Sequence, residues 1–308
     1  MRLSLAILFS LLILSTGCDR SGLGPAELPS DYLEDLERWK ENRVESLKDT
    51  TGWMRLAGMY WLESGENRFR SGEEMDIQFP EGTIPEEAGT FIYDDGTVRM
   101  VVEEGVEITH DQRRVTDMVI FDGSDEVPHL EHGSLHWRVI ARGDLVGIRL
   151  YNEENEKVDQ FTGFESYPVD TNWVRKARYV PKPEGSSITV VNVLGQEVQE
   201  PSPATLEFTW GGETYSLDAI DSDDDMFLIV GDETNQTETY QAGRYLYVEF
   251  PEDGSEFTQI DFNKLYNPPC AYNLFTTCQL PPPQNRLGLA IPVGEKRPDE
   301  WKGLHDNE

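Results

Sequence analysis

The residues best suited to chemistry lie in one irregular segment near the C-terminus, from Asp261 to Arg286. The segment holds Cys270 and Cys278 together with five prolines, several aromatic rings and a set of amide and guanidinium side chains. Three kinds of chemistry fit these residue types. The two thiols can form a disulfide, Cys270 can act as a nucleophilic or redox thiol, or the polar side chains can recognise a ligand.

The two cysteines stand eight positions apart. Outside the cytoplasm such thiols oxidise when their Cα atoms come within about 7 Å of each other. Closing so short a loop contributes about 2.5 kcal/mol in the chain-entropy model. We therefore expect a disulfide between Cys270 and Cys278, stiffened by the flanking prolines. The reactive-thiol alternative needs a cation that lowers the pKa of Cys270, for which Lys264 and Arg286 are the candidates.

The polar side chains of the segment form the mixture expected where an apolar pocket carries a few orienting donors. The candidate ligand-binding residues are Asn263, Tyr266, Asn267, Asn285 and Arg286. Arg286 suits a carboxylate or phosphate, although an internal acid such as Asp261 would serve it equally well. The sequence thus favours a binding or interaction module with a pocket near Arg286. The alternative is an extracytoplasmic enzyme that uses Asp261, Cys270 and Arg286.

The N-terminus predicts the compartment. A basic residue, an apolar run and a small-residue sequence ending in Cys18 resemble a bacterial lipobox. We expect a lipoprotein signal peptide over residues 1–17, lipidation of Cys18 and a flexible tether over 18–29. An ordinary secretory signal is the alternative. The lipid anchor would hold the protein at the cell envelope, facing the periplasm or the exterior, where its partner is a small polar or anionic ligand or an envelope protein.

The charge of the chain excludes one class of partner. With 58 acidic and 26 basic residues, the formal net charge is -32, whereas nucleic-acid binding needs clustered Lys and Arg. The acidic residues are spread along the chain, as on a solvated, salt-adapted surface. A calcium site at Asp223 to Asp225 lacks the alternating ligands and the glycine of an EF-hand loop.

Three closely spaced histidines invite a zinc interpretation, but the sequence does not support it. His129, His132 and His136 would need a helix to converge, and Pro128 and Gly133 break that helix. On a strand, His132 and His136 would stand about 13 Å apart. We therefore expect neither a metal nor a cofactor.

The hydrophobic pattern predicts a mainly β protein, with two antiparallel sandwich or barrel-like units preceded by two N-terminal helices. Residues 30–64 form the helical segment: one helix begins near Asp31, and a second is predicted over Trp53 to Leu62 from its aromatic spacing. Short alternating runs separated by turn dipeptides such as Asp95-Gly96 then predict β-units at 65–160 and 161–298. Residues 299–308 form a polar tail.

The first β-unit resembles a forkhead-associated-like β-sandwich. The resemblance covers roughly residues 65 to 151 and is carried by Phe69 to Pro80, Gly89 to Phe91, the Asp95-Gly96 turn and Leu135 to Ile140. Such modules bind phosphothreonine through an arginine, a serine and a histidine-supported loop. Arg70 and Ser71 lie near the right place, but the Ser-x-x-His element is missing around Ile84 to Ala88. The resemblance therefore implies a fold rather than phosphopeptide binding.

The chain as a whole resembles the domain of unknown function 1684 family. The resemblance is carried by Gly52-Trp53, Tyr60 to Leu62, Tyr167-Pro168, Asn192 to Gly195, Thr239-Tyr240, Gly243 to Tyr245, and above all the block from Asp261 to Arg286. It spans nearly all of residues 31 to 297. As the family's name says, the resemblance implies no assigned activity.

Overall fold

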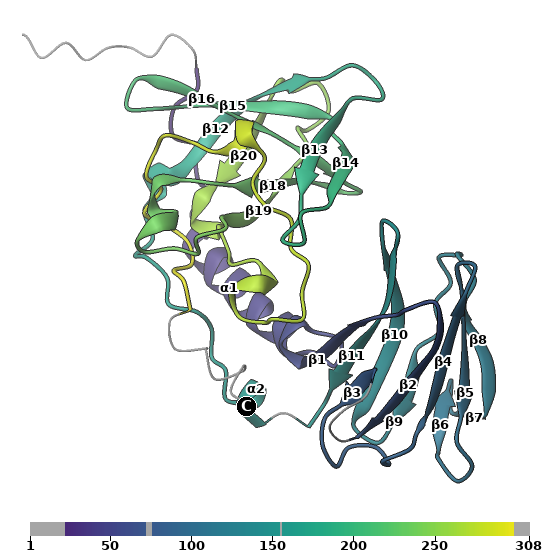
Figure 1. Cartoon of the computed structure of the whole chain (residues 1–308). Helices are drawn as coiled ribbons and strands as arrows, with labels where there is room; N and C mark the ends of the chain where they lie inside the picture. The colour runs from purple at the N-terminus through teal and green to yellow at the C-terminus, as the bar shows by residue number, and fades with distance from the viewer. Residues whose placement is uncertain (1–21, 72–75, 155, 299–308) are drawn as a thin grey trace, which may run out of the picture.

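The computed structural model describes residues 22–71, 76–154 and 156–298. The predicted signal peptide, the lipidation at Cys18 and the polar tail therefore lie outside the described residues. Within them the fold is mainly β, with several antiparallel sheets (Figure 1), and the predicted fold class is confirmed at this level. No helix in the described ranges has the length and apolar character needed to cross a membrane.

The first β-unit is a sandwich of two sheets. A six-stranded sheet has the order β1-β11-β10-β9-β6-β7, and a five-stranded sheet has the order β3-β2-β4-β5-β8. All pairs are antiparallel except β2 with β3. The strands are β1 (Leu56–Trp61), β2 (Gly65–Ser71), β3 (Ile77–Phe79), β4 (Gly89–Asp94), β5 (Thr97–Val102), β6 (Ile108–His110), β7 (Arg113–Val115), β8 (Asp117–Phe121), β9 (Leu130–His132), β10 (Leu135–Arg142) and β11 (Leu145–Asn152).

The core of this sandwich is made by the inward half of each alternating strand. Phe69, Phe91 and Trp137 are almost fully buried between the two sheets. The rings of Phe69 and Phe91 stack at 4.3 Å. Since successive side chains of a strand point to opposite faces, the neighbours of Trp137, His136 and Arg138, point away from this core. The outer face of the six-stranded sheet is thus left to meet the rest of the molecule.

The second β-unit holds a four-stranded sheet (β16-β15-β12-β20), a three-stranded sheet (β17-β18-β19) and a hairpin (β13-β14). A short α2 (Glu156–Asp159) and the 3-10 turn η2 (Thr171–Trp173) lead into it. Its strands are β12 (Val174–Pro181), β13 (Ser187–Val191), β14 (Glu197–Pro201), β15 (Ala204–Trp210), β16 (Glu213–Asp218), β17 (Ile220–Ser222), β18 (Asp225–Val230), β19 (Arg244–Glu249) and β20 (Phe257–Asp261). Four 3-10 turns shape the remainder: η3 (Glu233–Gln236), η4 (Phe262–Lys264), η5 (Pro269–Ala271) and η6 (Pro283–Asn285).

Helix α1 (Tyr32–Lys48) lies beside the second unit and runs toward the first (Figure 1). Its acidic first turn and Lys48 in its last turn complement the helix dipole. Leu36 packs near Val174 at one end, whereas Leu47 joins a small core with Met54 and Tyr272 at the other. The helix therefore connects the sandwich, the second unit and the C-terminal segment.

The second N-terminal helix predicted over Trp53 to Leu62 is wrong. The structure has a short 3-10 turn, η1 (Trp53–Arg55), followed by strand β1, which pairs with the edge of β11. Tertiary pairing outweighs the aromatic spacing here. Gly58 of this strand leaves no room for a side chain, because an added Cβ would lie 2.5 Å from the ring of Tyr60. The aromatic stripe is thus part of a sheet.

Candidate functional site

The two cysteines of the C-terminal segment lie in contact and are free thiols in the structure. The amide of Cys270 donates to the sulfur of Cys278 at 3.1 Å, and the amide of Cys278 donates back to the sulfur of Cys270 at 3.2 Å. The thiol of Cys278 and the hydroxyl of Thr276 donate to Cys270, and these bonds lower the pKa of Cys270 to about 7. The hydrogen bond to Cys270 and burial raise the pKa of Cys278. The expected disulfide stays a prediction, with its two sulfurs already adjacent.

Asn263 and Asp261 belong to a buried network that holds the start of α1. The hydroxyl of Tyr32 donates to Asp261 at 3.1 Å, and the amide of Asn263 donates to both of these side chains. Asn263 also exchanges two bonds with the backbone of Asp170. Burial raises the pKa of Asp261. Every polar atom of the Asn263 side chain is thus occupied within the protein.

Tyr266 and Asn267 gather around Arg43, a residue of α1. The guanidinium of Arg43 lies 4.4 Å from the centroid of the Tyr266 ring and donates to the carbonyl of Asn267 at 3.2 Å. It also forms an ion pair with Glu295 at 2.5 Å, and Glu295 accepts from the amide of Asn267 at 2.7 Å. Three of the five predicted residues, Asn263 included, therefore lie along α1.

Asn285 and Arg286 lie elsewhere, beside strands β16 and β18. Asn285 is fully buried and clamps the backbone of Asp218, since its amide accepts from the Asp218 N–H at 2.7 Å and donates to the Asp218 carbonyl at 2.9 Å. Arg286 is exposed, and its backbone forms a bridge with Gly231. Neither residue lines any of the four described cavities. Among the described residues, no hydrogen bond or ion pair joins the side chains of Asp261, Cys270 and Arg286.

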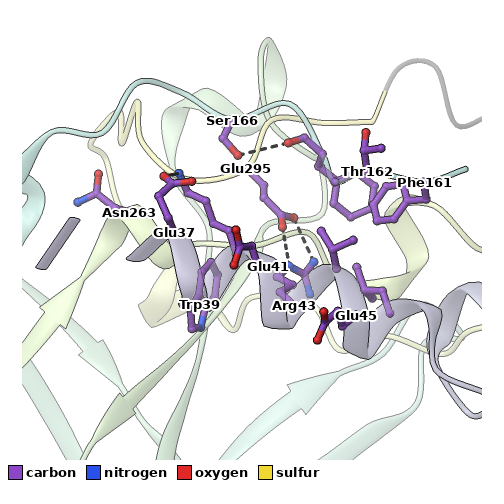
Figure 2. A pocket seen from close by; sticks show the side chains of 15 residues that line it. Glu37, Trp39, Glu41, Arg43, Glu45, Phe161, Thr162, Ser166, Asn263 and Glu295 are labelled. Carbon is purple, nitrogen blue, oxygen red and sulfur yellow. Dashed lines mark hydrogen bonds and ion pairs between the residues drawn. The ribbon is translucent and has the colours of Figure 1, made fainter. Parts of the chain in front are cut away.

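A first cavity, of about 380 Å³, lies on one side of α1 and is shown in Figure 2. The bend from Phe161 to Ser166 forms its opposite wall. Its charged side chains are largely committed to each other, because Arg43 pairs with Glu295 and Lys40 pairs with Glu37 at 2.7 Å. Figure 2 shows the Arg43 and Glu295 pair inside the cavity, with two bonds between them. This cavity therefore offers few unpaired donors to a ligand.

A second cavity, of about 400 Å³, lies on another side of Arg43 and is lined mainly by aromatic rings. We call it the aromatic groove. Its rings come from α1, η1, β18, β19 and the C-terminal segment and are Trp39, Trp53, Phe227, Tyr245, Tyr247, Tyr266 and Tyr272. Burial raises the pKa of the phenols of Tyr245, Tyr266 and Tyr272. These phenols therefore stay protonated, which suits hydrogen bonding rather than proton abstraction.

A third cavity, of about 470 Å³, adjoins the aromatic groove and shares four residues with it: Trp53, Phe227, Tyr245 and Pro269. We call it the arginine cavity. Its other walls are the β10-β11 hairpin, which brings Arg142 and Arg149 from the sandwich, the β13-β14 hairpin, and Thr276 to Gln279. Cys278 lines it as well. The two cavities therefore lie next to each other where the two β-units meet the C-terminal segment, and we refer to them together as the hollow.

The sequence pointed to the C-terminal segment but missed the rest of this hollow. Trp39 and Arg43 come from α1, and Arg149 comes from the sandwich, more than a hundred positions from Tyr266. The aromatic spacing around Trp53 was one available signal. Among the described residues, no group of three or more His, Cys, Asp or Glu side chains is arranged to hold a metal ion.

The fold and the hollow define a mainly β protein in which two adjacent cavities, one lined by aromatic rings and one by arginines, lie where the two β-units meet. Residues 159–296 match the family described as Protein of unknown function (DUF1684). The predicted resemblance to this family is therefore confirmed for that region, which is less than half of the chain. No curated protein matches the chain.

Two solved structures are similar to parts of the chain. One is the solution NMR structure of an uncharacterized protein from Haloarcula marismortui, with 29% identity over 47% of this chain and 82% of the other, at a TM-score of 0.39. The other is the crystal structure of the FhaA FHA domain in complex with the intracellular domain of a second protein. It has 14% identity over 30% of this chain and 85% of the other, at a TM-score of 0.22. Both likenesses are partial, and the second is weak.

Proposed function

We propose that the protein is a ligand-binding module of the cell envelope that takes a small ligand with a flat apolar face into the aromatic groove. A volume of about 400 Å³ falls within the usual range for small-molecule pockets. Seven rings from five separate parts of the chain converge there, beside a few fixed polar groups. This convergence is the observation that carries the proposal.

The state of the rings supports binding rather than packing alone. Tyr247 is 50% exposed although it stacks on Tyr266 at 6.3 Å and contacts Phe227 at 5.1 Å. Trp39 and Trp53 are also only partly buried. Rings that pack solely for stability are normally closed off from water, whereas a contiguous exposed aromatic surface typically marks a binding site.

The N-terminal residues supply the compartment in this proposal: a signal peptide over residues 1–17 and lipidation at Cys18 would hold the groove outside the cytoplasm. In that oxidising location the adjacent thiols of Cys270 and Cys278 become a disulfide that stiffens one wall of the hollow. A Cys18→Ser variant that loses incorporation of a labelled fatty acid, and with it membrane attachment, would support the anchor. Retained attachment would refute it.

A second candidate function is thiol chemistry at Cys270. The specific observation in its favour is the lowered pKa of this thiol beside Cys278, the arrangement that a dithiol needs to react at neutral pH. The cause is the neighbouring thiol and hydroxyl rather than Lys264 or Arg286. A quantitative disulfide that survives mild reductant would remove this candidate.

Phenol is a suitable probe for the binding proposal, because it offers a flat ring and one hydroxyl. We expect saturable binding of phenol by ligand-observed NMR and quenching of tryptophan fluorescence. Tyr247→Ala should weaken it about two- to tenfold, the range that aromatic stacking supplies. Tyr215→Ala, the same truncation on β16 outside the groove, is the matched control. Binding that Tyr247→Ala leaves unchanged would refute the proposed site.

A further inference from the structure

Two arginines face each other across the strands of the sandwich without an acid between them. Arg138 of β10 and Arg149 of β11 are register partners in an antiparallel pair, so their side chains leave the same face of the sheet. Like charges directly opposite each other destabilise a sheet. Arg142, at the end of β10, adds a third positive charge. Burial is the main cause that lowers the pKa of Arg149, and the charges of Arg142 and Arg138 lower it further.

The arginines are notable because acids are abundant in this protein. In the part of the chain that the structure describes, neither Arg138, Arg142 nor Arg149 forms an ion pair with a carboxylate. The Nε atoms of Arg138 and Arg149 are buried without a hydrogen-bond partner. With 58 acids and 26 basic residues, chance placement would supply a carboxylate readily. Something other than an internal acid is the natural partner of these cations.

Arg149 is oriented as a ligand-binding arginine would be. Only 4% of the residue is exposed, yet it lines the arginine cavity. Its guanidinium lies 4.9 Å from the centroid of the Trp53 ring and donates a hydrogen bond to the hydroxyl oxygen of Tyr151. The cation is thus held in place by a ring and a neutral hydroxyl, neither of which neutralises its charge. A buried charge of this kind is costly unless it is paired.

The charge of the cavity as a whole is positive. Arg142 is exposed at the hairpin, where, among the described residues, its guanidinium donates to the carbonyl of its neighbour Ala141. The lining contains one carboxylate, that of Glu200, which already accepts from the amide of Gln279 at 2.5 Å. The two lining arginines therefore outnumber the acid in a molecule that is otherwise strongly negative.

We propose that the arginine cavity is an anion subsite, which binds an oxyanion group, phosphate or carboxylate, of a ligand whose flat apolar part lies in the aromatic groove. Guanidinium groups suit both oxyanions, because their N–H donors match two oxygens at once. The assignment of the apolar part rests on the function proposed above, whereas the subsite rests on the arginines alone. Trp53, which lines both cavities, would lie at the junction of the two parts of the ligand.

Four probes test the two parts separately by isothermal titration calorimetry: phenol, inorganic phosphate, phenyl phosphate and phenylacetate. We expect at least one of the two aromatic anions to bind about tenfold or more tightly than phenol, the advantage of a charge-assisted bond. Which of them binds more tightly identifies the oxyanion. Added NaCl should weaken the binding of the aromatic anions and leave the binding of phenol unchanged, because salt screens interactions between charges.

Arg149→Gln should abolish the preference for the anion while phenol binds as before. Because Arg149 has no acid partner, the variant should melt no lower than the parent, a result that a merely structural arginine would not give. Arg142→Gln, at an exposed position, should lower the affinity for the aromatic anion several-fold. Arg99→Gln is the matched control, because Arg99 lies in the other sheet of the sandwich and pairs with Asp117.

The outcomes separate the two proposals. If phenyl phosphate and phenylacetate bind no more tightly than phenol, or if Arg149→Gln keeps the preference, the anion subsite is refuted and the aromatic groove stands. If phenol does not bind but inorganic phosphate does, with dependence on Arg149, the subsite stands and the proposed function falls. If none of the probes binds, both are refuted.

Discussion

Replacing Arg244 with methionine tests whether one buried ion pair holds the C-terminal strap that carries Glu295. Arg244 of β19 and Asp232 are both fully buried, with 2.8 Å between Nη2 and Oδ2. The same guanidinium donates to the carbonyls of Ile291 at 2.8 Å, Val293, and Glu295 at 3.4 Å. Without it, three carbonyls lose a donor and the Asp232 carboxylate loses its only cationic partner among the described ion pairs.

The expected loss of stability follows from the Asp232 carboxylate, which stays buried when Arg244 is removed. Removing one partner of a buried ion pair costs about 3–5 kcal/mol, because the other charge stays buried and unpaired. For a protein of this size that corresponds to a melting temperature lower by on the order of 10 °C. Adding Asp232→Asn removes the stranded charge but keeps an oxygen to accept from the N–H of Thr234. The double variant should therefore recover at least half of the loss.

The free energy of unfolding is measured by urea unfolding, followed by circular dichroism, for the parent, the two single variants and the double variant, which together form a double-mutant cycle. Arg178→Met is the matched control, because Arg178 pairs with Glu207 at 3.6 Å on the surface and such pairs contribute about 0–1 kcal/mol. If the losses of the two single variants simply add in the double variant, the coupling energy is zero. The stability would then come from packing around Arg244, and the reasoning from charge would be refuted.

Three further predictions concern the C-terminal segment. In reduced protein, Cys270 should react with iodoacetamide half-maximally near pH 7, as its pKa of about 7 implies, and oxidation should raise the free energy of unfolding by about 2.5 kcal/mol. A profile centred near pH 8.5, the value of an ordinary thiol, would contradict this. Asn285→Ala should lower the free energy of unfolding by about 2 kcal/mol or more, because two buried backbone groups lose their partner; unchanged stability in urea with loss of ligand binding would instead make Asn285 a ligand residue. Burial raises the pKa of Asp261 in the folded protein above its value in the unfolded chain. Protonated Asp261 therefore contributes fully to stability below the unfolded pKa, and this contribution is lost as the pH rises through the folded pKa. Asp261→Asn should flatten that part of the curve of unfolding free energy against pH, and an unaltered slope would assign the proton to another group.

The strand content was predictable because its signals are local. Alternation in segments such as Thr97 to Val102 and the Asp95-Gly96 turn depend only on neighbouring residues. The helix predicted after Trp53 was wrong because the signal for this segment is not local. Its strand exists because β11 lies beside it, and that partner is almost ninety positions away. Spacing within the segment carries no record of such a partner.

The sequence pointed to the C-terminal segment, but it placed the pocket near Arg286, which lines none of the described cavities. The C-terminal segment does line the hollow through Tyr266, Tyr272 and Cys278. Amides such as Asn263 have the residue type of ligand contacts, yet this side chain is used to satisfy backbone groups inside the protein. A sequence shows which groups can donate and accept, whereas only the fold shows which of them are already taken.

Helix α1 is held in place by hydrogen bonds to residues that lie late in the sequence and are therefore synthesised late. Tyr32 bonds to Asp261, 229 positions later, and Arg43 to Glu295, 252 positions later. The sandwich, by contrast, closes its two sheets within residues 56–152. Contacts of such long range form late, since the intervening chain must first be ordered. During synthesis, therefore, the sandwich can fold early, while α1, although it comes early in the sequence, is among the last elements to be docked.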